Sequence, residues 1–143
     1  MVTDGLEELR EIIRGMHPPA LDDGLPTALA TLAARSAVPT EFRNQLRSRP
    51  SDAVATTLYF TAAELLTNVA RHARASAACV SLAEVDGRIA LAVSDDGCGG
   101  ARARAGGTGL TGLRRRAEAL DGFLTIDSPD GGPTTVTVVL PGG

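Results

Sequence analysis

Asp95 is the residue of this sequence whose type and position point most directly to chemistry. It closes a β-rich run and is followed at once by a turn that contains Gly97 and Gly99. A carboxylate at a strand end can accept a hydrogen bond from the exocyclic amino group of adenine, and residues without a Cβ let the chain turn sharply beneath the ring. Asp-Asp-Gly is also an ordinary turn sequence. This cluster therefore predicts a purine contact only if other groups converge on it.

A second polar cluster lies on a helical pattern upstream. Glu64, Asn68 and His72 are spaced by four residues, so they share one stripe of the helix with Arg71 beside them. Mg²⁺ takes one or two protein oxygens and fills its remaining positions with phosphate and water, so the amide oxygen of Asn68 could bind it. Glu64 could orient a water or accept a proton, with Arg71 and His72 near the phosphates. The same stripe would also suit the wet face of any helix.

A third cluster consists of Gly107, Thr108, Gly109 and Leu110, which precede another helical pattern. Amides at a helix start can face an anion, but a helix end contributes only about 0.3–1 kcal/mol. Even millimolar binding needs about 4 kcal/mol. The base contact and the metal must therefore supply most of the affinity, so the three clusters predict a nucleotide site only together. The run of arginines at residues 114–116 is interpreted as a solvated helix face.

The basic residues narrow the phosphate chemistry further. All 14 residues counted as Lys or Arg are arginines. A Walker loop and the protein-kinase signature each need a lysine, and Schiff-base chemistry needs an amine, so these three classes are excluded. Phosphates must then be bound by backbone amides, helix N-termini, arginines and a metal ion.

Composition excludes several other classes. The chain has 143 residues, the length of one ordinary domain, with a net charge of -3 and no extended basic stripe, so nucleic acid is not expected as a partner. Cys79 and Cys98 fit no metal spacing and are expected to be reduced. No apolar run approaches the roughly 20 residues of a membrane span. We therefore expect a cytoplasmic domain without membrane contact.

The pattern along the chain predicts an α+β fold, with a layer of about three helices on an antiparallel-rich sheet of four or five strands. A hairpin is expected at Asp86-Gly87, and a helix start after Ser51. The expected helices are residues 5–16, 21–35, 52–75 and 110–120; the expected strands are residues 37–43, 78–84, 88–95, 122–126 and 134–140; and residues 100–107 form a loop.

The three clusters also resemble the motifs of one family. Residues 64–73 resemble the N box of the GHKL ATPases, residues 95–99 the first glycine box, and residues 107–110 the second. Within that superfamily the chain is most similar to the ATP-binding catalytic domain of bacterial two-component sensor histidine kinases. Residues 14–22 resemble the linker of the subgroup that is paired with helix-turn-helix response regulators.

The resemblance implies a Bergerat-type two-layer α/β sandwich with a mixed, mostly antiparallel sheet. Residues 1–20 would be the tail of a dimerisation helix and a linker, and residues 21–143 the ATP-binding domain with a lid at residues 100–107. Asn68 would bind Mg²⁺, Glu64 would assist transfer, and Asp95 would bind adenine, with Pro133 stiffening the backbone before Thr134. The remaining nucleotide-binding residues implied are Arg71, His72, Gly97, Gly99, Gly107, Thr108, Gly109, Leu110 and Thr134.

The function implied is transfer of the γ-phosphoryl group of ATP, with Mg²⁺, to a histidine on a dimerisation domain. His17 is rejected as the acceptor because Pro18 and Pro19 follow it. The acceptor would lie upstream, the full protein would be a homodimer that may be membrane-anchored, and its cognate response regulator would be the downstream partner. Two alternatives stay open: an anti-sigma or serine-kinase regulator of the same fold, and a degenerate domain that only docks partners.

Overall fold

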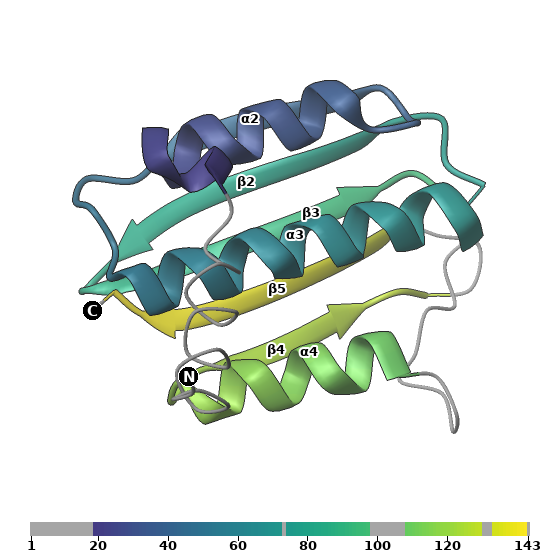
Figure 1. Cartoon of the computed structure of the whole chain (residues 1–143). Coiled ribbons are helices and arrows are strands. Elements are labelled where there is room, and N and C mark those ends of the chain that lie inside the picture. Colours follow the sequence, from purple (N-terminus) through teal and green to yellow (C-terminus); the bar gives the residue numbers. More distant parts are fainter. Residues whose placement is uncertain (1–18, 73, 98–107, 130–132, 143) are drawn as a thin grey trace, which may run out of the picture.

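The protein is described by a computed structural model that covers residues 19–72, 74–97, 108–129 and 133–142 (Figure 1). A mixed five-stranded sheet has the order β1-β2-β3-β5-β4, in which only β1 and β2 run parallel. The three α-helices found in the described residues lie on one face of this sheet, which confirms the predicted two-layer α+β fold. The elements are η1 (Pro19–Asp23), α2 (Leu25–Arg35), β1 (Thr40–Gln45), α3 (Asp52–His72), β2 (Ala78–Val85), β3 (Arg88–Asp95), α4 (Thr108–Ala119), β4 (Phe123–Asp127) and β5 (Thr134–Pro141).

The core lies between the sheet and the helices. Alternate residues of β2, β3 and β5 are buried, as expected for strands that are covered on one face. Each buried aliphatic side chain contributes about 1.5–3 kcal/mol relative to exposure. Helix α3 crosses the middle of the sheet, between α2 and α4 (Figure 1). Its buried stripe is Val54, Ala55, Leu58, Thr61, Ala62, Leu65, Leu66 and Val69.

Local signals explain where several elements begin and end. The N–H of Val54 donates to the Ser51 hydroxyl, so Ser51 caps α3 as predicted. Asp86 and Gly87 both have positive φ, at 53° and 77°, which is the type I′ turn predicted between β2 and β3. Helix α4 ends where Asp121 takes a left-handed conformation with φ 62°.

Three boundaries differ from the sequence-based predictions. The helix expected over residues 21–35 is a 3-10 turn, then Gly24 with φ 95°, then α2 from Leu25. Pro26 accounts for this, because proline is tolerated only in the first turn of a helix. The strand expected at residues 37–43 is β1, shifted towards the C-terminus. Helix α3 ends at His72, and Arg74 with φ 51° cannot continue it.

The helix expected at residues 5–16 and the loop expected at residues 100–107 lie outside the described residues. The division between residues 20 and 21 stays a prediction, although η1 spans it. None of the described helices is both long and apolar enough to cross a membrane.

Candidate functional site

Elements that carry the predicted clusters meet at one end of the molecule. Strand β3 ends there at Asp95, and the sheet register pairs Asp95 directly with Thr134, the first residue of β5. The C-terminal half of α3 and the start of α4 lie at the same end (Figure 1). Antiparallel pairing explains the meeting of Asp95 and Thr134, because the end of one strand then lies beside the start of its neighbour. Residues far apart in the sequence therefore converge.

The Asp95 side chain has the features of a binding carboxylate. It is only 7% exposed, on the face of β3 that the helices cover. Its Oδ1 accepts a hydrogen bond from the Gly97 amide at 2.7 Å, and within the described part of the chain Oδ2 has no donor. Burial, followed by the charge of Asp96, raises the pKa of Asp95, while the Gly97 amide opposes that rise. A buried oxygen of this kind is suited to a ligand's amino group.

Thr134 is the second buried polar residue of this pair of strands, also 7% exposed. Its hydroxyl lies 2.6 Å from the hydroxyl of Ser128, which follows β4. Pro133, which precedes it, is exposed and leaves the pairing of Thr134 with Asp95 intact. Ser128 was not predicted as a site residue, because a serine between two strands carries no sequence signal of the partner it contacts.

Asp96 was read from the sequence only as part of a turn. In the structure its Oδ1 accepts hydrogen bonds from the amides of Ser76 and Ala77 at 2.8 and 3.0 Å. Its Oδ2 accepts one from the Ser76 hydroxyl. These hydrogen bonds, led by that of the Ser76 hydroxyl, lower the pKa of Asp96, so the group is ionised at neutral pH. Nothing in the sequence indicates these partners.

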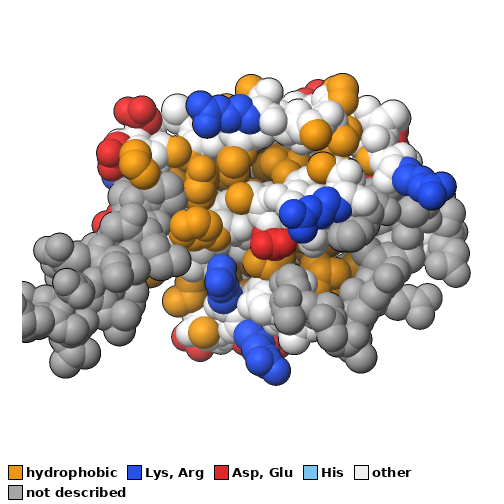
Figure 2. Space-filling view, turned by 45° about the vertical axis from the view of Figure 1, so that its right-hand side comes forward, with side chains coloured by type: hydrophobic (Ala, Val, Ile, Leu, Met, Phe, Trp, Pro, Cys, Tyr) orange, Lys and Arg blue, Asp and Glu red, His pale blue; other side chains and the backbone are white. Residues whose placement is uncertain are grey.

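The polar stripe of α3 lies along its C-terminal half. Asn68 is half-buried between the buried Leu65 and Val69, whereas Glu64 and Arg71 are exposed. His72 is the last residue of α3, and its side chain lies outside what the structure describes. Figure 2 shows hydrophobic side chains gathered in the furrows between the helices, with arginines on the outer surfaces. Of the described side chains of the stripe, Asn68 is therefore the one that is partly withdrawn from solvent.

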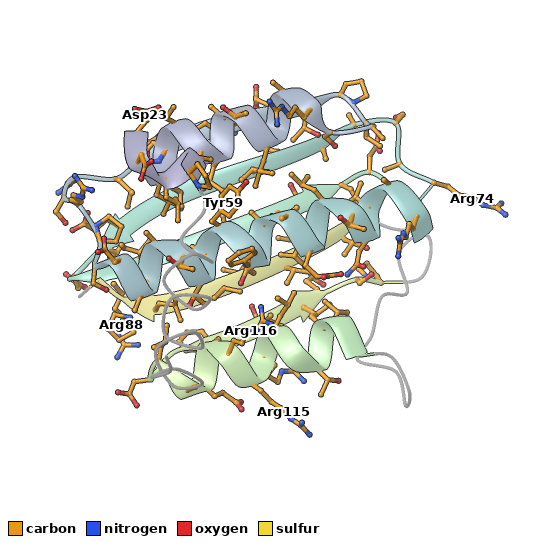
Figure 3. All side chains as sticks on the ribbon, in the orientation of Figure 1. Asp23, Tyr59, Arg74, Arg88, Arg115 and Arg116 are labelled. Atoms are coloured by element: carbon orange, nitrogen blue, oxygen red, sulfur yellow. The ribbon has the colours of Figure 1, made fainter. Side chains whose placement is uncertain are left out.

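The glycine clusters are described only in part. Gly97 is buried beneath Asp95, while Gly99 and Gly107 lie outside the described residues. Thr108 and Gly109 start α4, two residues earlier than predicted, and the half-buried Leu110 packs against the core. Arg115 and Arg116 of α4 are exposed, and Arg115 extends away from the protein (Figure 3). The solvated face predicted for residues 114–116 is thus found at Arg115 and Arg116, whereas Arg114 is half-buried.

Two further findings concern cofactor binding. Within the described ranges no three His, Cys, Asp or Glu side chains are grouped so that they could hold a metal ion. A shallow hollow lined by Leu25, Pro50 and Ala55 lies near the N-terminal ends of α2 and α3, away from Asp95, so it is not part of this site.

Comparison with known proteins decides the family. Residues 53–143 match the family described as histidine kinase-, DNA gyrase B- and HSP90-like ATPase. The chain belongs to this ATPase family. The match includes α3, β3 and β5 and therefore every described residue of the candidate site. Membership fits the convergence of a buried carboxylate, an amide oxygen and a helix start at one end of the sheet.

Individual relatives of this ATPase are sensor kinases. Sensor histidine kinase MctS of Rhizobium johnstonii is 34% identical over 95% of this chain and 32% of its own length. The histidine kinase domain from the blue-light activated histidine kinase of Erythrobacter litoralis EL346 has the same fold, with a TM-score of 0.63 and 19% identity over 82% of this chain and 59% of that one. The structure of full-length ShkA in complex with AMPPNP also has this fold. Its TM-score is 0.65, with 15% sequence identity, and the match covers 82% of this chain and 29% of ShkA. The chain spans about a third of the length of MctS, the curated relative named above.

Proposed function

We propose that this chain is the ATP-binding catalytic domain of a sensor histidine kinase. It would pass the γ-phosphoryl group of ATP to a histidine on a dimerisation domain of the same protein. The observation that carries the proposal is the buried Asp95 carboxylate paired with Thr134, in a chain of this ATPase family. The similarity to sensor histidine kinases favours histidine as the acceptor.

In this proposal Asp95 recognises the adenine. Its buried Oδ2 would accept the exocyclic amino group, while the Gly97 amide keeps Oδ1 in place. The Thr134 hydroxyl, held by Ser128, would form the second polar contact at the same strand ends. Gly97 and Gly99 carry no Cβ and would let the backbone approach the ring closely.

The polar stripe of α3 would serve the phosphates. Asn68 would bind Mg²⁺, which when present offsets the charge of the triphosphate. Glu64 would accept the proton of the attacking group or orient water, and Arg71 and His72 would lie near the phosphates. Gly107, Thr108, Gly109 and Leu110 would present amides of the α4 start to the same anion. Catalysis would come mainly from positioning and charge neutralisation.

The adenine contact is tested by Asp95→Ala. Loss of a hydrogen bond to a charged group costs about 1.5–3 kcal/mol, so we expect ATP affinity in calorimetry to fall about 10- to 150-fold. Asp23→Ala is the matched control, because Asp23 is an exposed aspartate at the far end of the molecule (Figure 3). Unchanged ATP affinity in a folded Asp95→Ala protein would contradict the assignment.

The magnesium contact is tested by Asn68→Ala. We expect ATP binding to lose its dependence on Mg²⁺, because the amide oxygen is the protein ligand. Thr67→Ala is the control: Thr67 is the exposed neighbour on α3, and its hydroxyl donates to the carbonyl of Ala63 in the same helix. An Asn68→Ala protein whose affinity still rises with Mg²⁺ as in the wild type would rule out this role.

Phosphoryl transfer is tested by mixing the chain with the dimerisation domain of its parent protein and labelled ATP. The proposal expects label on that domain that is lost in acid and kept in base, as for phosphohistidine. Acid-stable label would favour the serine-kinase alternative instead. We further propose that the domain acts in the cytoplasm, within a homodimer whose phosphohistidine supplies a response regulator.

A further inference from the structure

The side chain of Asp96 joins the end of β3 to the segment that follows α3. After α3 ends, the chain turns at Arg74 and enters β2 through Ser76 and Ala77. Asp96 accepts three hydrogen bonds from this segment, two from amides and one from the Ser76 hydroxyl. We name this set of hydrogen bonds the Asp96 bridge. It forms where the β2–β3 ladder ends, since Ala78 and Asp95 are the last pair in register.

A strand end needs such support here. Among the described residues, the backbone beyond Asp95 makes one long hydrogen bond, from the Asp96 amide to the Ala77 carbonyl at 3.3 Å. The next residue is Gly97, whose backbone is the most permissive of any residue. Ends of ladders with few bonds open readily. Asp95 itself pairs with Ala78 and Thr134, and the Asp96 bridge adds three hydrogen bonds just beyond this pairing, where the ladder ends.

The bridge uses the Asp96 side chain and leaves the Asp95 side chain available for a ligand. Successive strand residues point to opposite faces, so Asp95 faces the helices while Asp96 is exposed. Fixing the Asp96 side chain thus orients the Asp95 carboxylate without competing for its oxygens. The bridge also connects the strand of Asp95 to the segment between α3 and β2.

We infer that Asp96 is a positioning residue for nucleotide binding: through its bridge to Ser76 and Ala77 it holds the end of β3 so that the Asp95 carboxylate meets the purine amino group. The inference rests on the proposed role of Asp95. It assigns Asp96 an effect on recognition of the base, and none on the phosphates.

The chain contains a matched control for this role. Glu84, near the other end of β2, makes the same kind of bridge. Its carboxylate accepts hydrogen bonds from the amides of Arg47 and Ser48 and from the hydroxyl of Ser48. Its Oε1 lies 2.9 and 3.0 Å from those two amides. Glu84→Ala therefore removes an equivalent set of exposed hydrogen bonds far from Asp95, and it measures the general structural cost of losing such a bridge.

The experiment measures by calorimetry the binding of Mg-ATP and of Mg-purine riboside triphosphate, which lacks the amino group. For Asp96→Ala we expect about tenfold weaker ATP binding, the loss of about one well-placed hydrogen bond, and less than about twofold change for the analogue. Asp96→Asn should restore ATP binding to within about threefold, because its amide oxygen still accepts both backbone N–H groups. Glu84→Ala should leave both affinities within about twofold.

A double variant separates the two proposals. In an Asp95→Ala background, adding Asp96→Ala should have no further effect on ATP affinity, because residues that act through one contact are not additive. Equal weakening of ATP and the analogue by Asp96→Ala, or a loss matched by Glu84→Ala, would overturn the inference and leave the proposed function standing. Unchanged ATP affinity in Asp95→Ala would instead overturn the proposed function, and this inference with it.

Discussion

Gly122 joins α4 to β4 at a point where the structure has no room for a side chain. Its amide donates to the Ala117 carbonyl at 2.8 Å and that of Asp121 to the Glu118 carbonyl at 3.0 Å, the two bonds of a Schellman cap. Asp121, and not Gly122, takes the left-handed conformation of this cap. A Cβ at position 122 would lie 2.1 Å from the Val139 carbonyl oxygen and 2.5 Å from Leu140 Cδ2. Glycine is therefore required at position 122 because any side chain would clash with β5.

Gly122→Ala is accordingly expected to destabilise the protein strongly. Overpacking costs about 1–3 kcal/mol, and we expect about 3 kcal/mol because the closest atom belongs to the backbone of β5 and cannot rotate away. That is a large share of the roughly 5–15 kcal/mol by which a domain is stable. At about 2–4 °C per kcal/mol, the melting temperature should fall by about 10 °C.

The assay is thermal unfolding followed by circular dichroism, with urea unfolding as a second measurement. Gly112→Ala is the control: Gly112 lies within α4 and a Cβ there meets nothing within 4 Å. It should stabilise the protein by about 0.5–1 kcal/mol through helix propensity. A melting temperature for Gly122→Ala within about 2 °C of the wild type would refute the packing argument.

Two further predictions concern the cap of α3 and the pH dependence of binding. Ser51→Ala removes the acceptor of the Val54 amide and should cost about 1 kcal/mol in urea unfolding; no change would mean that water replaces the cap. The pKa of Asp95 is raised, so its carboxylate becomes protonated at a higher pH than an ordinary aspartate, whose pKa is about 3.9. ATP binding should therefore weaken as the pH falls through the pKa of Asp95. The folded state favours the protonated form of Asp95, so the contribution of Asp95 to the free energy of unfolding increases over the same fall in pH. An ATP affinity that stays constant down to about pH 4 would contradict the raised pKa.

The elements predicted well from the sequence are those whose signals are local. The β2–β3 hairpin follows from Asp86-Gly87 between two β-rich runs, and α3 follows from Ser51 and a long helical pattern. The strand order does not follow from such signals. The parallel pairing of β1 with β2, and the place of β5 between β3 and β4, depend on contacts between residues distant in the sequence.

The candidate site divides in the same way. Asp95, Asn68 and Thr134 were predicted from motifs, and the structure brings Asp95 and Thr134 together. The Asp96 bridge and Ser128 could not be predicted, because each depends on a partner brought near only by the folded sheet. The roles of Gly99 and Gly107 stay predictions. Motifs thus identify groups that contact a ligand better than groups that hold those contacts in place.

If Asp95 and Thr134 both contact a nucleotide, as proposed, their pairing decides which strands the binding energy stabilises. Asp95 belongs to a hairpin built from neighbouring residues, whereas Thr134 arrives on the last strand, after α4 and β4. A ligand bound by both residues stabilises the contact between the β2–β3 hairpin and the last two strands. At a ligand concentration of about 100 times the dissociation constant, this adds about 2.7 kcal/mol to the free energy of separating them. Slower hydrogen exchange across β3 and β5, and not only around the ligand, is the expected signature.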